Sequence, residues 1–452
     1  MTLTTPPRTR GQRGGGAPVL GRTQRVPARD PALPTGKTRR GRLEFLDALR
    51  GVAALSVVVQ HGGEFLWRSY FRWSEEWFRP GEFGVVLFFL CSGYIIPASL
   101  ERHGSLRRFW IGRFFRLFPL YWTVLLMALV LHALHGTSLP PGEFFQEHGA
   151  VVNTLANVTM LQEFLAVPLI LGQSWSLAYE LSFYTITSLL FLAGWHKRSV
   201  PLAGAGLVVT LLAGNLVRPV WLTLPMGNRA HLLILIAAAL GVLVGCFVGG
   251  SPARRVIAGL LTTAVVLLTT NAPAPLWFSM LLMTTMFVGT VLCRYGKGEV
   301  SGRAAAAVYG GALAVIVAVH VLRVSPQLLP IAGAGNAHVT RIHPEIPTFL
   351  AAYLVFGAGL LARRCRFPRI LIWFGTISYS LYLMHAVVMY HVPWWGADKA
   401  LTMIRWVALS IAVSALTYYI VEKPGIALGH RVADRLGPTR RRAEQSSYAT
   451  AG

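Results

Sequence analysis

Residues 82–100 read EFGVVLFFLCSGYIIPASL, and this stretch decides the fold class. Its only charge is Glu82, and it is long enough to cross the hydrocarbon core of a bilayer as one α-helix. Similar apolar runs recur along the chain, twelve in the best layout, with ten or eleven as alternatives. They predict an all-α, polytopic transmembrane helix bundle of about 10–12 spans. The predicted spans are 44–62, 82–100, 114–135, 173–194, 199–217, 230–249, 254–272, 274–293, 303–323, 346–363, 369–391 and 402–422.

Composition supports a membrane protein. Of the 452 residues, 54% are hydrophobic and only 13% charged, and the mean hydropathy is +0.52, whereas soluble proteins average about 25% charged residues. These values exclude an ordinary cytosolic enzyme, a disordered protein and a disulfide scaffold. We attribute the net charge of +24 to a membrane and expect no nucleic-acid partner. The four cysteines form no CxxC pair, so we expect free buried thiols and no metal site. They are Cys91, Cys246, Cys293 and Cys365.

The distribution of charge predicts three regions and an orientation. Residues 1–42 are predicted to be a disordered basic cytoplasmic tail, 43–424 the membrane domain, and 425–452 a short basic cytoplasmic tail. The layout places 32 of the 42 Lys and Arg residues on one side of the membrane. By the positive-inside rule this side is the cytoplasm, which predicts a plasma-membrane protein with both termini inside. The longest outside loop, 136–172, contains Glu163 and would cap a site from the exterior.

The first span contains ionisable residues, which are costly in a membrane and are therefore functional candidates. Arg50 and His61 are 11 residues apart, so they share one helix face and lie about 16.5 Å apart along the axis. Two other roles are open for Arg50: it could anchor the helix end at the membrane interface, or it could pair with Asp47. His61 could instead be a histidine at the outer membrane interface without a function.

Polar residues on later spans add to this set. Glu180 belongs to a stripe on one helix face, formed by Gln173, Ser176, Glu180 and Tyr184. Its carboxylate should face the bundle interior and have a partner there. Its role is either functional, or it is the structural partner of an arginine. Ser378, Tyr382 and His385 also share a face, although a lone histidine among aromatic residues is more often structural.

Two further patterns lie near the second and third spans. Arg113 and Arg116 are three residues apart on one face, which suits phosphate groups but also lipid headgroups or simple anchoring. The Ser92-Gly93 pair is small enough to let helix backbones approach closely.

Four blocks of sequence follow one another along the chain. They are Leu46–Gly51 through His61; Phe83–Tyr94 with Arg113-x-x-Arg116 and Phe118–Trp122; Trp175-Ser176-Leu177 with Glu180 and Phe183-Tyr184; and Ser378–His385 with Val421–Pro424. Together, in this order, they resemble the acyltransferase family 3 of integral membrane proteins, which O-acylate sugars and other hydroxylated compounds. The blocks are spread over residues 43–424, so the resemblance covers most of the chain, with a departure at Val86-Leu87, where many members carry an acidic residue.

The resemblance implies O-acyl transfer, in the simplest case O-acetylation, in the bacterial cell envelope. The co-substrate would be acyl-coenzyme A, with no bound cofactor. The acceptor would be a hydroxylated glycan, a glycolipid or an antibiotic, and membrane lipid would surround the protein. In this reading His61 acts as general base or transient acyl carrier, and Glu180 orients His61 or the acceptor. Arg50, Arg113 and Arg116 bind the donor. Residues with a substrate-binding or structural role would be Ser92, Trp175, Ser176, Tyr184 and His385.

A transporter or flippase of glycans is the competing class. It explains an even number of spans and intramembrane charges equally well. It does not explain the ordered motif blocks, and the chain has no internal repeat that would support an inverted-repeat transporter.

Overall fold

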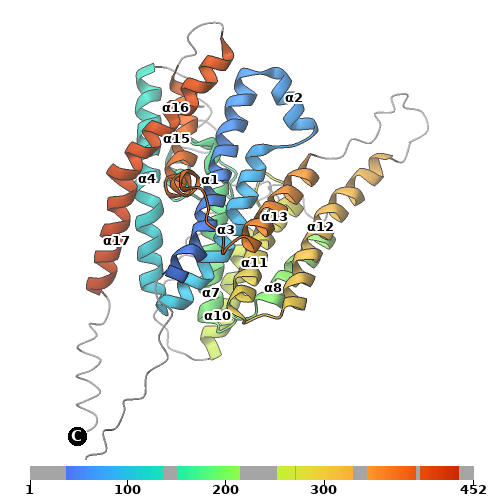
Figure 1. Cartoon of the computed structure of the whole chain (residues 1–452). Helices are drawn as coiled ribbons and strands as arrows, with labels where there is room; N and C mark the ends of the chain where they lie inside the picture. Colours follow the sequence, from blue (N-terminus) through green and yellow to red (C-terminus); the bar gives the residue numbers. More distant parts are fainter. Residues whose placement is uncertain are drawn as a thin grey trace, which may run out of the picture. The chain divides into compact units, whose positions relative to one another are not determined.

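The computed structural model describes residues 37–135, 150–213, 252–269, 271–328, 344–392 and 398–436. The chain divides into two units, Met1–Arg40 and Gly41–Gly452. Every regular element in the described ranges is a helix, which confirms the predicted all-α class (Figure 1). The predicted span 230–249 lies outside the described residues, as do most of the two predicted tails.

The helices vary widely in length. They are α1 (Lys37–Leu66), α2 (Arg68–Glu76), α3 (Pro80–His103), α4 (Leu106–His135), α6 (Ala150–Val158), η1 (Gly172–Ser174), α7 (Trp175–Leu192), α8 (Ser199–Ala213), α10 (Pro252–Thr269), α11 (Leu276–Lys297), α12 (Gly302–Leu328), α13 (Glu345–Leu361), α14 (Arg369–Thr376), α15 (Ser378–His391), α16 (Lys399–Thr417), η2 (Tyr418–Glu422) and α17 (Lys423–Leu436).

Within the described residues, five helical segments are long and apolar enough to cross a membrane. They are Pro80–His103, Leu106–Leu134, Leu276–Lys297, Gly302–Val319 and Lys399–Leu436. The pair α14 and α15, bent by 71°, would make a sixth span. The helices α1 and α7 are not among these segments, and both carry polar candidate residues. The protein is therefore a multi-pass membrane protein, and the count of about 10–12 spans stays a prediction.

The predicted single span 369–391 is wrong in one respect, since two helices occupy it. The chain bends between α14 and α15 close to Gly375, where the backbone carbonyl of Asp47 in α1 approaches. A Cβ atom at position 375 would lie 1.9 Å from that oxygen, so only glycine fits there. This contact fixes α14 against the first helix.

Small residues also bring α3 and α11 together. A Cβ atom on Gly93 would lie 1.9 Å from the Met286 carbonyl oxygen, and Thr290 Oγ1 donates a hydrogen bond to the Gly93 carbonyl oxygen at 2.9 Å. The close backbone approach predicted for Ser92-Gly93 is thus present. The helix α3 also packs against α7 and α13, so it holds several helices together.

The prediction for the cysteines is partly wrong. Cys91 and Cys293 are free and buried, as expected, but Cys365 is exposed in the turn that follows α13. Cys246 lies outside the described residues.

The last two long helices join without a break. Between α16 and α17, residues Tyr418–Glu422 form one π-helical turn, a feature that often marks functional sites. The turn directs Glu422 into the interior, where its carboxylate accepts a hydrogen bond from Ser380 Oγ at 2.7 Å. Figure 1 shows α17 running beside α4.

Candidate active site

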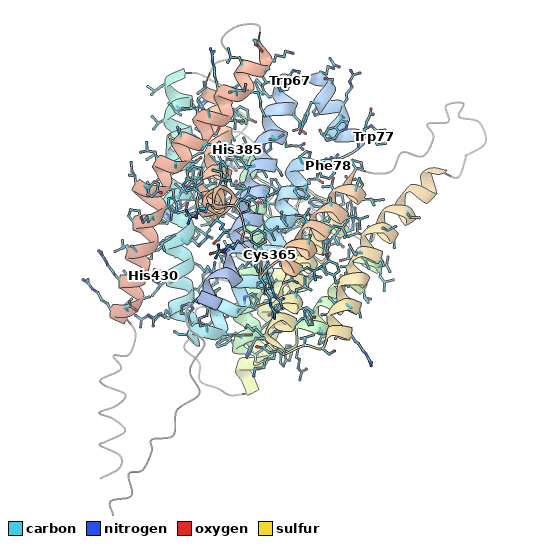
Figure 2. All side chains as sticks on the ribbon, in the orientation of Figure 1. Trp67, Trp77, Phe78, Cys365, His385 and His430 are labelled. Atoms are coloured by element: carbon cyan, nitrogen blue, oxygen red, sulfur yellow. The ribbon has the colours of Figure 1, made fainter. Side chains whose placement is uncertain are left out.

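Two histidines from opposite ends of the chain meet inside the bundle. Nδ1 of His61 in α1 lies 2.9 Å from Nε2 of His385 in α15, and the two rings stack with their centroids 5.0 Å apart. His385 is completely buried, and Figure 2 shows it in the interior, surrounded by side chains. His61 is exposed to a cavity instead.

The hydrogen bonds of His385 define which nitrogen of His61 is basic. Nδ1 of His385 lies 3.0 Å from the carbonyl oxygen of Leu381, which can only accept, so this nitrogen carries the proton. A neutral His385 therefore presents the lone pair of Nε2 to His61, and Nδ1 of His61 must be the donor. With both rings neutral, Nε2 of His61 is left as the basic atom.

Glu180 of α7 lies in a separate hydrogen-bond network. Its Oε1 atom accepts hydrogen bonds from Ser92 Oγ in α3 at 3.1 Å and from Tyr184 Oη at 2.6 Å. The bond to Tyr184 follows the predicted stripe, whereas Ser92 comes from another helix. The carboxylate thus has the interior partners that a charge in a membrane requires.

Three arginines gather around this network. The guanidinium of Arg113 stacks on the ring of Tyr184, with its central carbon 5.1 Å from the ring centroid. Arg50 interacts electrostatically with Arg116 and Glu180. No hydrogen bond or ion pair of these three guanidinium groups is found with the described residues. Their donors are therefore available to an anion.

Two cavities are lined by candidate residues, and Tyr382 lines both of them. The smaller, about 50 Å³, is lined by Arg50, Ser92, Ser176 and Glu180. The larger, about 390 Å³, contains His61 and Trp175. The side chain of Tyr382 is fixed between them, because its hydroxyl donates to the Gln173 carbonyl oxygen at 2.5 Å and lies 2.7 Å from Ser176 Oγ.

The larger cavity has an acidic lining. Four carboxylates and one guanidinium contribute to it, those of Glu64, Glu75, Arg79, Glu82 and Glu163. Trp175 and Phe278 add aromatic surface. Among the residues that the structure describes, no three His, Cys, Asp or Glu side chains converge as a metal site requires.

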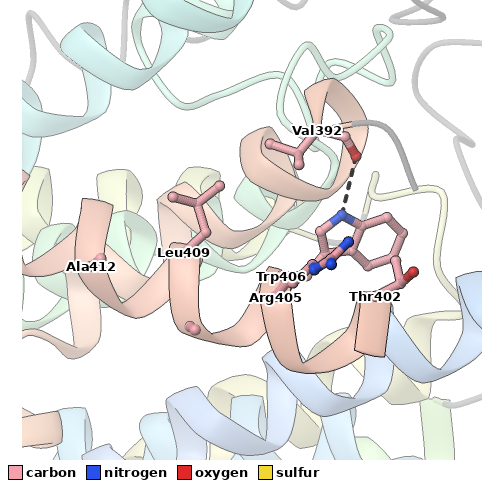
Figure 3. Close-up of a pocket in the computed structure, with 7 residues that line it drawn as sticks. Val392, Thr402, Arg405, Trp406, Leu409 and Ala412 are labelled. Atoms are coloured by element: carbon pink, nitrogen blue, oxygen red, sulfur yellow. Dashed lines mark hydrogen bonds between the residues drawn. The ribbon is translucent and has the colours of Figure 1, made fainter. Parts of the chain in front are cut away.

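A third hollow lies away from these residues. It has a volume of about 430 Å³ and is lined mainly by apolar side chains at the junction of α15 and α16, where Trp406 Nε1 donates to the Val392 carbonyl oxygen at 3.1 Å (Figure 3). None of the candidate residues lines it.

The structure brings the sequence candidates into two groups. Arg50, Ser92, Ser176, Glu180 and Tyr184 lie around the smaller cavity, where Arg113 stacks on Tyr184 and Arg116 interacts with Arg50. His61, Trp175 and His385 lie at the larger cavity or beside it.

The sequence analysis assigned no role to Glu422, Glu64 or Tyr382. Glu422 is a buried acid in an apolar span, which was a usable signal. The pairing of His61 with His385, 324 residues apart, had no sequence signal.

Comparisons with known proteins show the family of this chain. The sequence profile described as "Acyltransferase domain" matches residues 43–422. Peptidoglycan O-acetyltransferase OatA of Listeria monocytogenes is 25% identical over 370 residues, which cover 78% of this chain and 50% of OatA. Acyltransferase MdmB of Streptomyces mycarofaciens is 29% identical over 173 residues, covering 35% of this chain and 41% of MdmB.

A third relative, the putative peptidoglycan O-acetyltransferase YrhL of Bacillus subtilis, is 28% identical over 166 residues, covering 33% of this chain and 24% of YrhL. The chain thus spans half or less of the length of each relative. No solved structure matches it. Because the acyltransferase profile covers nearly the whole membrane domain, this chain belongs to the acyltransferase 3 family of membrane acyltransferases.

Proposed function

We propose that this protein transfers an acyl group, in the simplest case acetyl, from acyl-coenzyme A to a hydroxyl group of a carbohydrate or glycosylated acceptor. The observation that carries the proposal is the hydrogen bond between His61 and His385. It leaves a basic nitrogen on a residue that lines a cavity of about 390 Å³, a size typical of small-molecule sites.

In the proposed reaction, Nε2 of His61 removes the proton from the acceptor hydroxyl. The oxygen attacks the thioester carbonyl, a C–O bond forms, and the C–S bond breaks as the coenzyme A thiolate leaves. The proton on His61 then passes to the thiolate. The alternative is attack by Nε2 itself, which gives a transient acyl-imidazole that the acceptor hydroxyl resolves.

The arginines around the smaller cavity are proposed to hold the donor. Coenzyme A carries several phosphate oxygens, and guanidinium groups bind phosphate through two parallel hydrogen bonds. Arg50, Arg113 and Arg116 have donors that no described residue occupies. Glu180 would hold the side chains of Ser92 and Tyr184 in place near these guanidinium groups, because both hydroxyls donate hydrogen bonds to its carboxylate.

The proposed donor and acceptor sites lie at different depths. Arg50 and His61 are about 16.5 Å apart along α1, and Tyr382 and Val85 line both cavities. The acyl group must therefore pass this pair of side chains, either on the arm of the donor or by relay. With both termini in the cytoplasm, His61 would lie toward the outer side.

A first experiment tests the reaction. Membranes containing the protein or its His61→Ala variant are incubated with radiolabelled acetyl-coenzyme A and an envelope extract. We expect label on an acceptor only with the unaltered protein, while the variant still binds coenzyme A. Equal labelling by both proteins would contradict the role of His61. Glycan movement across vesicles without any donor would favour the transporter class.

A second experiment tests the orientation. The His61→Cys variant, in a background without other cysteines, is treated in intact cells with a membrane-impermeant thiol reagent. We expect modification from the outer side. Modification from the cytoplasmic side alone would overturn the proposed arrangement.

A further inference from the structure

We propose that the cavity around His61 binds an acceptor that carries a protonated amine near its reactive hydroxyl, with Glu163 as the counter-ion. This inference rests on the proposed function, because it takes the larger cavity as the acceptor site. Among carbohydrate and glycosylated acceptors, it selects one class, the sugars that carry an amine and their conjugates.

The charges that line the cavity are unbalanced. Among the described residues that line it, the one Lys or Arg is Arg79, which already binds three carboxylates, those of Glu75 and Glu82 at 2.8 Å each and of Glu345 at 3.2 Å. Glu64 and Glu163 have no ion pair with a described residue. Two carboxylates of the cavity therefore have no ion pair at contact distance with a described residue, and a positively charged ligand would balance them.

Glu163 is the more unusual of the two. The residue is only 7% exposed and lines the cavity, yet no hydrogen bond or ion pair of its carboxylate is found with the described residues. A buried carboxylate without a partner is costly. Burial alone raises the pKa of this carboxylate to about 7. Such a group is better explained by a ligand than by stability.

The backbone holds Glu163 in this position. On one side of it, Gln162 Nε2 donates to Ser174 Oγ at 2.8 Å. On the other side, the Phe164 carbonyl oxygen accepts a hydrogen bond from Asn271 Nδ2 at 2.9 Å. Both neighbours are thus fixed to other segments, which fixes the chain at the position from which the Glu163 side chain projects.

Aromatic rings complete the site. Trp175, Phe278 and Tyr382 line the same cavity, and the rings of Trp175 and Phe278 lie 6.0 Å apart. An alkylammonium group is attracted to aromatic faces as well as to carboxylates. Aromatic faces together with carboxylates that have no ion pair are a combination that recognises amines. An acceptor with a carboxylate or phosphate at this point would be repelled.

The test uses the full chain in lipid nanodiscs without an acyl donor, so that no turnover occurs. Binding of methyl glucosaminide, which carries a protonated amine at neutral pH, is compared with binding of methyl glucoside, which has a hydroxyl in its place. We expect the amine to bind about tenfold tighter or more, and Glu163→Gln to remove most of that preference. The matched control is Glu76→Gln, since Glu76 lies beside Glu75 on α2 but does not line the cavity; it should retain the preference.

The outcomes separate this inference from the proposed function. Absence of amine-dependent binding, or an equal loss in the control, overturns the amine site. A second assay adds acetyl-coenzyme A and measures O-acetylated product from both sugars. Equal transfer to both contradicts the amine site and keeps the acyltransferase. Amine-dependent binding without any transfer keeps the site and contradicts the proposed reaction.

Discussion

The Nδ1 atom of His61 and the Nε2 atom of His385 lie 2.9 Å apart, and the Leu381 carbonyl accepts from the far nitrogen of His385. Because the Leu381 carbonyl can only accept, Nδ1 of His385 must donate to it, and Nδ1 of His61 must then donate to Nε2 of His385. His385 is thus a positioning residue for His61, comparable to the acid that fixes the histidine in serine hydrolases.

Replacing His385 should therefore lower the turnover number without weakening substrate binding. In His385→Leu, His61 loses the acceptor that holds its proton on Nδ1, and we expect kcat to fall by about a hundredfold or more. In His385→Gln, the side-chain carbonyl oxygen can still accept that bond, so kcat should be partly restored.

The measurement is kcat and the acceptor KM in both variants, with thermal unfolding to verify the fold. A merely structural role for His385 predicts losses that track stability. Equal kcat values for two equally stable variants would therefore contradict the positioning role.

The arginine pair on α4 makes a prediction about the donor. Arg113→Ala combined with Arg116→Ala should weaken coenzyme A binding by about tenfold or more, because charge-assisted hydrogen bonds contribute about 1.5–3 kcal/mol each. Arg107→Ala is the matched control, since its Nη1 atom donates to the Leu436 carbonyl oxygen away from both cavities. Isothermal titration calorimetry with the purified proteins measures the coenzyme A affinity of the double variant and of the control. An unchanged affinity in the double variant refutes the assignment of Arg113 and Arg116 to the donor.

The sequence predicted much of the local structure of the site. Apolar runs predict helices, and helical periodicity placed Glu180 and Tyr184 on one face, where they form a hydrogen bond. Contacts across the bundle are a different matter. Nothing in the residues around Ser92 specifies that its hydroxyl donates to Glu180, because that depends on how α3 packs against α7.

The bend between α14 and α15 shows the same limit. Residues 369–391 form a continuous apolar run, so periodicity predicts one straight span. The close approach of the Asp47 carbonyl to Gly375 is a tertiary contact and leaves no pattern in the run itself. The bend matters because α15 carries both Tyr382 and His385, so it helps to set their position beside α1.

Tyr382 makes a prediction about passage between the cavities. Because this side chain lines both of them, the bulkier Tyr382→Trp variant should lower acyl transfer while coenzyme A affinity stays unchanged. Tyr382→Phe keeps the size but loses the bonds to Gln173 and Ser176, so it should mainly lower stability, by about 1–3 kcal/mol. Transfer rates, donor affinity and thermal unfolding are measured for both. Full transfer by a folded Trp variant would contradict a route past Tyr382.

Glu163 makes a prediction about stability and pH. Glu163 lies in the segment between α6 and η1, and burial raises the pKa of its carboxylate from the ordinary value of 4.5 to about 7. Between these values the folded protein holds a proton that the unfolded chain has lost, so stability falls as pH rises through this window, and the loss is complete above pH 7. Glu163→Gln removes the carboxylate and should raise Tm at pH 8, with little change near pH 4.

The comparison of the two proteins isolates Glu163. The other titratable and charged groups near it, Glu64, Glu75, Arg79, Glu82, His61 and Tyr179, are present in both proteins. Their contributions therefore largely cancel in the difference between the two Tm values. A difference that does not change with pH would show that folding does not raise the pKa of this carboxylate. A gain at pH 8 would show that Glu163 costs stability where it is ionised, as expected for a carboxylate retained to bind a cation.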